Sequence, residues 1–125
     1  MAKLFITLAS LSGMLAVMLG AFGAHGLKNR LDGYALDVFH TAVQYHFYHS
    51  LALLAVGMIA LTQPDTQLLR SSGWLFVVGT VVFSGSLYLL AVTGLRWLGA
   101  ITPLGGLAFI AGWACLAAAS WKMLP

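Results

Sequence analysis

Charged residues divide the chain into four long neutral stretches. The nine charged side chains, six Lys or Arg and three Asp or Glu, lie outside the stretches 4–27, 38–64, 71–95 and 97–121. A helix needs about 20 mostly apolar residues to cross a hydrocarbon layer of ~30 Å, and an unpaired charge at the bilayer centre is costly. The pattern therefore predicts an all-α integral membrane bundle of four transmembrane helices, formed by a single domain over 1–125.

Turn-forming residues set the expected helix bounds. Pro64 cannot donate a hydrogen bond to a continuing helix, and Thr102-Pro103 is typical of an N-cap followed by proline in the first turn. The connection that includes 25–37 is long enough for a short interfacial helix at about 32–39. The four transmembrane helices are expected at about 4–24, 40–61, 71–92 and 102–121.

Composition favours lipid over water as the solvent. Hydrophobic residues make up 61% of the chain and charged residues 7%, whereas a soluble domain has roughly 25% charged residues. Lys3 and the apolar run after it resemble a secretory signal peptide, but the run is longer than the apolar core of about 7–15 residues that such peptides have. The net charge of +3 does not predict nucleic-acid binding, because the basic residues are dispersed and form no patch.

Four crossings place both termini on one side of the membrane. The positive-inside rule compares the Lys and Arg residues on the two sides, and here the counts are equal. The terminal side has Lys3, Arg70 and Lys122, and the opposite side has Lys28, Arg30 and Arg96. We expect the termini to face the cytoplasm, although the rule itself does not decide the orientation.

Small residues recur in the first and last stretches at helical spacing. Gly13 and Gly20 belong to a stripe in the first stretch, and Gly105, Gly106 and Gly112 lie in the last. Small residues let helices approach closely in lipid, where packing replaces the hydrophobic effect. We expect these glycines to be helix-packing positions. The first stripe is also a candidate interface with a larger membrane complex. A homo-oligomer is expected as well, because four short helices bury few side chains by themselves.

Polar residues in two stretches are expected at the same depth. His46 and His49 are three residues apart and share a helix face, as do Tyr45 and His49 at a spacing of four. At ~1.5 Å per helical residue, His46 is level with Tyr88 and His49 with Ser84. The sequence thus predicts an inward-facing polar layer in one leaflet, with the two histidines at its centre.

Two interpretations of this layer remain open. The side chains can hydrogen-bond between helices, at ~0.6 to 2 kcal/mol each, or they can form a site for a ligand, a proton, a haem or a metal. A metal would be held by His46 and His49, but no carboxylate or cysteine lies at matching depth, and the sequence requires no cofactor. The candidate residues of a ligand or proton site are His46, His49, Tyr45, Ser84, Tyr88 and His25. Of these, His25 lies nearer the surface of the same leaflet, where we also expect it to cap the end of the first helix.

Enzymatic activity is not expected. No acidic residue lies inside a neutral stretch, so acid–base catalysis by paired carboxylates is excluded. The segment Phe83-Ser84-Gly85-Ser86 has serines but lies within a predicted helix, without the strained turn that exposes a nucleophile.

Four ordered blocks of the sequence resemble a known family. The blocks are Leu19-Gly-Ala-Phe-Gly-Ala-His-Gly26, Gln44-Tyr45-His46 with His49-Ser-Leu-Ala52, Phe83-Ser-Gly-Ser-Leu-Tyr88, and Ile101-Thr-Pro-Leu-Gly-Gly106 with Ala111-Gly-Trp113. They resemble the bacterial membrane proteins catalogued as domain of unknown function 423, which are similar to eukaryotic transmembrane protein 256. The resemblance covers nearly the whole chain and implies a four-helix inner-membrane protein, but it implies no activity. The matching blocks include His25, His46, His49, Ser84, Ser86 and Tyr88.

Overall fold

Helices account for nearly all of the chain. The computed structural model describes residues 1–63 and 65–125, so Pro64, expected to end the second helix, lies outside the described residues. The elements are α1 (Ala2–His25), α2 (Gly33–Thr62), α3 (Gln67–Gly79), the π-helix η1 (Thr80–Ser84), α4 (Gly85–Thr93), the 3-10 helix η2 (Arg96–Ala100) and α5 (Thr102–Met123). Since α3, η1 and α4 are continuous and η2 leads into α5, the described residues form four helical spans that are long and apolar enough to cross a membrane. The expected all-α, four-span architecture is confirmed.

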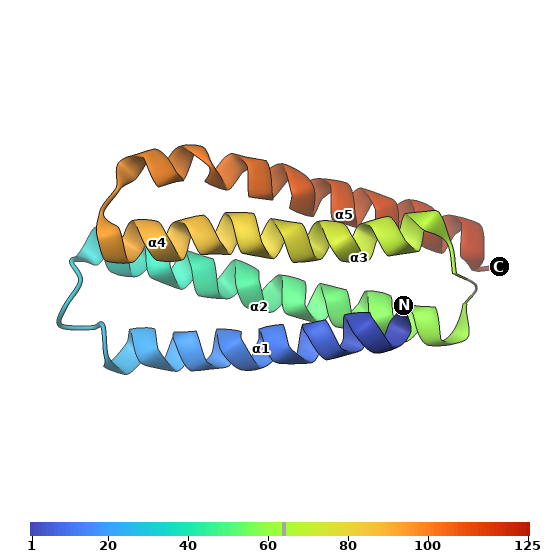
Figure 1. The fold of residues 1–125 in the computed structure, drawn as a ribbon, viewed down its shortest axis with the longest axis horizontal. Coiled ribbons are helices and arrows are strands. Elements are labelled where there is room, and N and C mark those ends of the chain that lie inside the picture. The colour runs from blue at the N-terminus through green and yellow to red at the C-terminus, as the bar shows by residue number, and fades with distance from the viewer. Residues whose placement is uncertain (64) are drawn as a thin grey trace.

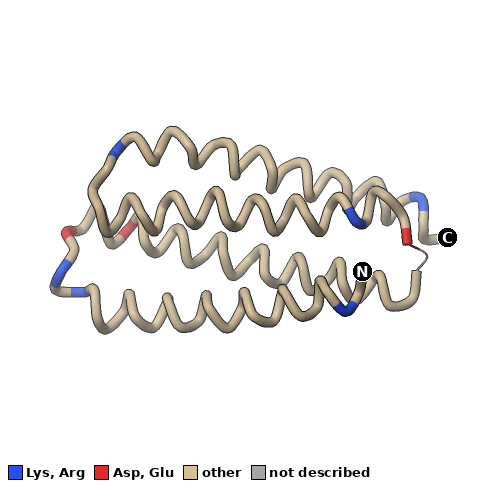
Figure 2. The backbone as a smooth tube through the Cα atoms, viewed as in Figure 1, with Lys and Arg blue, Asp and Glu red and all other residues tan. Residues whose placement is uncertain are grey.

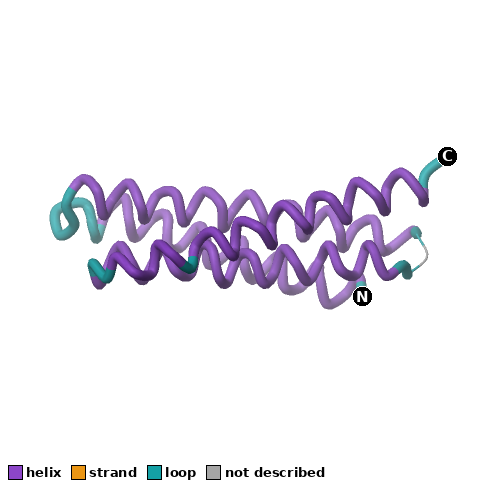
Figure 3. Tube along the Cα trace, turned by 90° about the horizontal axis from the view of Figure 1, so that it is seen from above, coloured by secondary structure: helices purple, strands orange, loops and turns teal. Residues whose placement is uncertain are grey.

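The four spans run side by side along one long axis (Figure 1). The inner pair consists of α2 and the α3–η1–α4 span, with α1 packed on α2 and α5 packed on α3. Seen from above, the spans form a narrow bundle with the connections at its two ends (Figure 3). Both chain termini lie at one end of the bundle, as an even number of crossings requires.

Charge is confined to the two ends of the bundle, and the length between them is uncharged (Figure 2). Large apolar side chains face outward along this length. Val17, Val81 and Ile110 have exposed fractions of 60%, 67% and 67%. A water-soluble bundle would place polar residues on that surface, so lipid is the solvent that fits it. The cytoplasmic placement of the termini stays a prediction.

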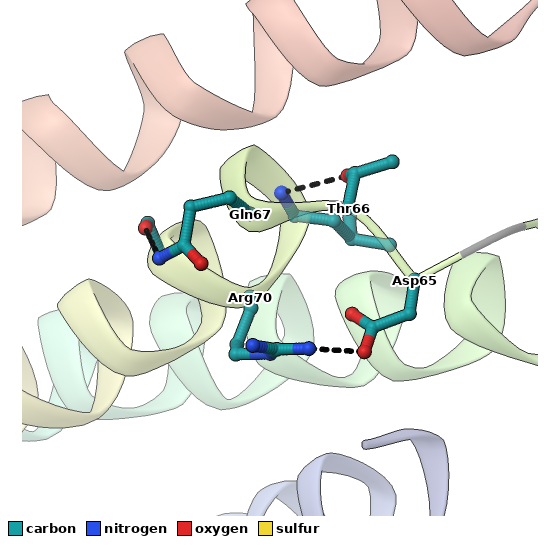
Figure 4. Close-up of polar contacts among 6 residues, drawn as sticks. Asp65, Thr66, Gln67 and Arg70 are labelled. Atoms are coloured by element: carbon teal, nitrogen blue, oxygen red, sulfur yellow. Dashed lines mark hydrogen bonds and ion pairs between the residues drawn. The ribbon is translucent and has the colours of Figure 1, made fainter.

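The polar end next to the termini has an exposed ion pair and a helix cap (Figure 4). Arg70 Nη2 pairs with Asp65 Oδ2. Thr66 Oγ1 accepts a hydrogen bond from Leu69 N at 3.2 Å and caps the start of α3. The Arg70 and Asp65 side chains are exposed and lie outside the uncharged length of the bundle (Figure 2).

Three helices begin before their expected positions, α1 at Ala2, α2 at Gly33 and α3 at Gln67, whereas α5 begins at Thr102 as expected but has a different N-cap. Asp32 caps α2 by accepting from Ala35 N at 2.7 Å, so the helix begins at Gly33 and includes the segment expected as a separate interfacial helix. Charged residues can occupy this first part of α2 because it lies towards the polar end of the bundle. In α5 the N-cap is Ile101 and not Thr102, because Thr102 Oγ1 is directed to Leu98 O and Ser86 Oγ. The proline does lie in the first turn of α5.

The glycines named from the sequence differ in how tightly they are packed. A Cβ atom added at Gly105 would lie 2.4 Å from Phe83 N, and one at Gly112 would lie 2.8 Å from the Phe76 ring. The corresponding distance at Gly20 is 3.2 Å, to Val43. Gly13 and Gly106 are looser, with nearest distances of 4.0 and 3.9 Å.

The stripe of small residues on α1 packs within the chain. Ala9 and Ala16 are buried, with exposed fractions of 4% and 1%. Gly13 and Gly20 face Ser50 and Val43 of α2. The surface that the sequence suggested for a partner is therefore covered by α2. Assembly into an oligomer or a larger complex stays a prediction, but it would have to use another surface.

Candidate functional site

His46 links three helices in the interior of the bundle. Its Nδ1 atom lies 2.9 Å from Tyr88 Oη on α4, and its Nε2 atom lies 3.1 Å from Ser12 Oγ on α1. Ser12 Oγ is in turn 2.6 Å from Ser50 Oγ, which donates to the His46 carbonyl at 2.8 Å. The imidazole is 4% exposed. We call this set of hydrogen-bonded residues, Ser12, His46, Ser50 and Tyr88, the His46 network.

His49 belongs to a different contact, between α2 and α5. Its Nδ1–H donates to the Tyr45 carbonyl at 2.7 Å, because a carbonyl can only accept. Its Nε2 atom accepts from Trp113 Nε1–H at 3.1 Å. The ring also stacks on Phe109, with centroids 3.5 Å apart and planes 8° from parallel. All hydrogen-bonding capacity of His49 is therefore used within the bundle, which is the arrangement expected of a helix-packing residue.

The other predicted site residues lie in three different environments. Ser84 is buried and donates to the Ala42 carbonyl at 2.8 Å, so it joins α2 to the end of η1. Tyr45 contributes its carbonyl to the layer and stacks its ring beside His49, and the residue is 39% exposed. His25 is exposed, is the last residue of α1 and precedes the C-cap Gly26, so it lies apart from the layer.

Sequence reasoning missed several members of the layer. Ser12 lies in a stretch that the sequence marks only as apolar, and Ser50 and Trp113 occur only within the blocks that resemble the family. Depth counted from the flanking charges does not identify them, because Ser12 lies 16 residues before Lys28 and Trp113 lies 17 residues after Arg96, whereas His46 and His49 lie nine and 12 residues after Asp37.

The His46 network lies beside a cavity of about 440 Å³ between α1, α2 and the α3–η1–α4 span. Its wall is mostly apolar, and the polar lining residues are Ser12, His46, His49, Thr80, Ser84 and Tyr88. Leu11, Leu15 and Val81 line the cavity and are 54%, 47% and 67% exposed on the outer surface. The cavity thus opens sideways, towards the surrounding lipid, between α1 and η1.

The π-helix η1 shapes one wall of this cavity. The Gly85 N–H bonds to the Thr80 carbonyl five residues back, and Thr80, Ser84 and Gly85 all line the cavity. On the opposite side of η1, Gly105 of α5 lies close to the Phe83 backbone. Single π-helical turns inside helices occur frequently at functional sites.

The histidine nitrogens fit a metal or a haem poorly. An imidazole ligand needs an unprotonated ring nitrogen that is free to coordinate. In His46 and His49 all four ring nitrogens have partners within the chain. In the chain outside Pro64, no group of three or more His, Cys, Asp or Glu residues could hold a metal ion.

These observations define an all-α multi-pass membrane protein with a buried His/Ser/Tyr hydrogen-bond network beside a lateral cavity. The chain belongs to the family described as Protein of unknown function (DUF423), which matches residues 19–106. The resemblance stated from the sequence blocks is confirmed.

The relatives are bacterial membrane proteins of similar length. The UPF0382 membrane protein YwdK of Bacillus subtilis (strain 168) is 49% identical over 122 residues, which cover 98% of this chain and 99% of the relative. A UPF0382 membrane protein of Staphylococcus saprophyticus is 49% identical over 121 residues, covering 97% and 99%, and one of Staphylococcus haemolyticus is 48% identical over 122 residues, covering 98% of both. No solved structure matches this chain.

Proposed function

We propose that the protein is a membrane binding module whose lateral cavity takes an apolar molecule with a hydrogen-bonding head group from the bilayer. The observation on which this depends is the position of the His46 network at the wall of an otherwise apolar cavity that opens to lipid. A volume of about 440 Å³ lies within the range of ~300–1,000 Å³ typical of small-molecule sites. Binding, and no catalytic step, is proposed.

The shape of the cavity favours an elongated occupant. Its α1 wall runs from Leu8 to Leu19, which at ~1.5 Å per residue is roughly 16 Å of helix. Ser12 lies partway along this wall, between apolar residues. One part of an elongated occupant would therefore contact polar groups, and the rest would contact apolar side chains. A lipid-soluble molecule with one polar group would satisfy both kinds of surface.

Helix packing accounts for only part of the polar layer. His49 with Trp113, and Ser72 with the Gly112 carbonyl, are hydrogen bonds between packed helices. The His46 network differs because both side-chain partners of His46, Ser12 and Tyr88, line the open cavity with it, whereas His49 lines the cavity but bonds to Tyr45 and Trp113, which do not. This contrast is why we assign the binding role to His46 and a packing role to His49.

The test fills the cavity at Gly85. This residue lines the cavity, and a Cβ atom added there meets no described atom within 4 Å, so Gly85→Leu should fold and obstruct the site. Gly33→Leu is the matched control, because Gly33 has equally open surroundings but does not line the cavity. Val81→Trp is a second cavity-obstructing variant, from the rim.

The measurement is binding of 4-nonylphenol to protein in lipid nanodiscs, with empty nanodiscs subtracted. We expect Gly85→Leu and Val81→Trp to weaken binding at least about tenfold, equivalent to ~1.4 kcal/mol, and Gly33→Leu to leave it unchanged. Equal binding by all four proteins, or binding no greater than that of empty nanodiscs, would contradict the proposed function.

A further inference from the structure

The directions of the hydrogen bonds around the cavity determine what it can offer an occupant. A hydroxyl group has one proton to donate and two lone pairs, and a neutral imidazole has one N–H group and one acceptor nitrogen. Each polar hydrogen on the lining residues can therefore be assigned to a particular acceptor.

Three of these hydrogens go to backbone carbonyls. Thr80 Oγ1 donates to Phe76 O at 2.8 Å. Ser84 Oγ donates to Ala42 O at 2.8 Å, and His49 Nδ1 donates to the Tyr45 carbonyl at 2.7 Å. A carbonyl cannot donate, so the direction of each bond is determined.

The remaining hydrogens belong to the His46 network, which has one consistent direction. Ser50 donates to the His46 carbonyl, so the hydrogen between the two serines must come from Ser12. Ser12 therefore accepts from His46 Nε2–H, which leaves Nδ1 as the acceptor for Tyr88 O–H. The opposite direction would leave the Ser12 and Ser50 oxygens 2.6 Å apart with no hydrogen between them.

Every polar hydrogen of these lining side chains is thus engaged within the described chain, and the groups left to an occupant are lone pairs. Tyr88 Oη, Ser12 Oγ and Ser84 Oγ each keep acceptor capacity. No charged side chain is found among the described lining residues, and an ion without a partner is costly inside a bilayer.

We infer that the cavity selects a neutral hydrogen-bond donor on an apolar body, that is, a lipid-soluble alcohol or phenol, including the hydroquinone form of a quinone. This inference rests on the proposed function and specifies its ligand. An ether or ketone of the same shape meets only acceptors and gains no hydrogen bond. The network sets this selectivity through Tyr88, whose own hydrogen is held by His46.

The experiment compares 4-nonylphenol with its methyl ether, 4-nonylanisole, in nanodiscs. These probes differ in the capacity to donate. We expect the phenol to bind about tenfold more tightly, the value of one hydrogen bond. Empty nanodiscs correct for the different partitioning of the two probes into lipid.

Variants of the network test the assigned direction. Ser50→Ala removes the oxygen to which Ser12 donates its hydrogen. The lining of the cavity stays the same, because Ser50 does not line it. The hydrogen bonds of the His46 network can then reverse their direction, which frees the Tyr88 hydrogen for the ether oxygen. The ratio of the phenol affinity to the ether affinity should therefore fall towards one. Ser72→Ala is the control, because it deletes another buried serine hydrogen bond, to Gly112 O, away from the cavity.

Substitutions at His46 provide an independent reading. His46→Leu frees the Tyr88 hydrogen and should also lower the ratio. His46→Gln should keep it, because the amide oxygen can accept from Tyr88 and the amide nitrogen can donate to Ser12.

The outcomes separate this inference from the function on which it rests. If the affinity ratio is near one in the wild type and Gly85→Leu weakens the binding of both probes, the inference is overturned and the proposed function stands. An unchanged preference for the phenol in both Ser50→Ala and His46→Leu also overturns it. Absence of binding by both probes overturns the proposed function as well.

Discussion

Tyr88 and His46 form a hydrogen bond between α4 and α2, with Tyr88 Oη 2.9 Å from His46 Nδ1. Tyr88 is the donor, because the serine chain on the other side of the ring requires a hydrogen on Nε2. One side chain therefore both holds two helices together and presents lone pairs to the cavity. The following predictions separate these two roles.

Removal of the Tyr88 hydroxyl should destabilise the bundle modestly. Tyr88→Phe leaves His46 Nδ1 without its donor, and we expect a loss of about 1 kcal/mol in the free energy of unfolding. Tyr48→Phe is the matched control, because Tyr48 is 53% exposed and has no hydrogen bond among the described residues. Reversible unfolding in mixed micelles, followed by circular dichroism, measures both. Equal losses in the two variants would contradict the assigned bond.

His49 and Trp113 should be energetically coupled. His49→Phe keeps an aromatic ring against Phe109 but removes the acceptor for Trp113 Nε1–H. Trp113→Phe removes the donor, so the double variant should be about 1 kcal/mol more stable than the sum of the single losses predicts. The pair His49→Phe and Trp97→Phe, in which Trp97 is exposed, should be additive. A coupling energy near zero for the first pair would show that the hydrogen bond does not contribute.

Adjacent glycines of α5 should respond differently to the same substitution. Gly105→Ala places a Cβ atom 2.4 Å from Phe83 N, which is backbone and cannot rotate away. The helices must separate at η1, and we expect a loss of about 1–3 kcal/mol. Gly106→Ala has 3.9 Å to its nearest neighbour and should be tolerated. The thermal unfolding midpoints of the two variants give the comparison, and similar midpoints would contradict close packing at Gly105.

The extended start of α2 depends on its cap. Asp32→Ala removes the acceptor for Ala35 N and should cost about 1 kcal/mol of stability. Amide hydrogen exchange should rise in the first turn of α2 and not at its centre. Asp37→Ala, a nearby substitution of the same kind, leaves the cap intact and should show neither effect. Unchanged exchange in the Asp32 variant would argue that α2 begins later.

The positions of charges were sufficient to predict the four spans, because a bilayer penalises charge over a known length. The same reasoning misplaced the start of α2. The neutral stretch 38–64 begins after Asp37, but a helix can extend beyond the hydrocarbon region, and α2 begins earlier, at Gly33, where Asp32 provides the cap. The π-helix η1 could not be predicted from the sequence either, because no local residue preference marks it and Gly105 packs against it from another helix.

Depth reckoning placed His46 level with Tyr88, and the structure joins the two by a hydrogen bond. Depth does not give the rotation of a helix about its own axis, so it does not predict which neighbouring helix each side chain contacts. His49 was expected level with Ser84, and both residues line the cavity, but the His49 ring bonds to Trp113 on α5. Residues three apart on a helix are rotated by ~300° around its axis, so two neighbours on one broad face can still contact different helices.

The central claim is that a lipid-soluble donor binds beside a neutral His46 with hydrogen on Nε2. Solid-state ¹⁵N NMR of the His46 ring in lipid, before and after addition of 4-nonylphenol, tests it most directly. We expect a protonated Nε2 and an unprotonated Nδ1, with the Nδ1 signal shifting as the phenol donates to Tyr88 in the wild type but not in Gly85→Leu. A hydrogen on Nδ1, or a His46 signal that does not respond to the phenol, would contradict the account.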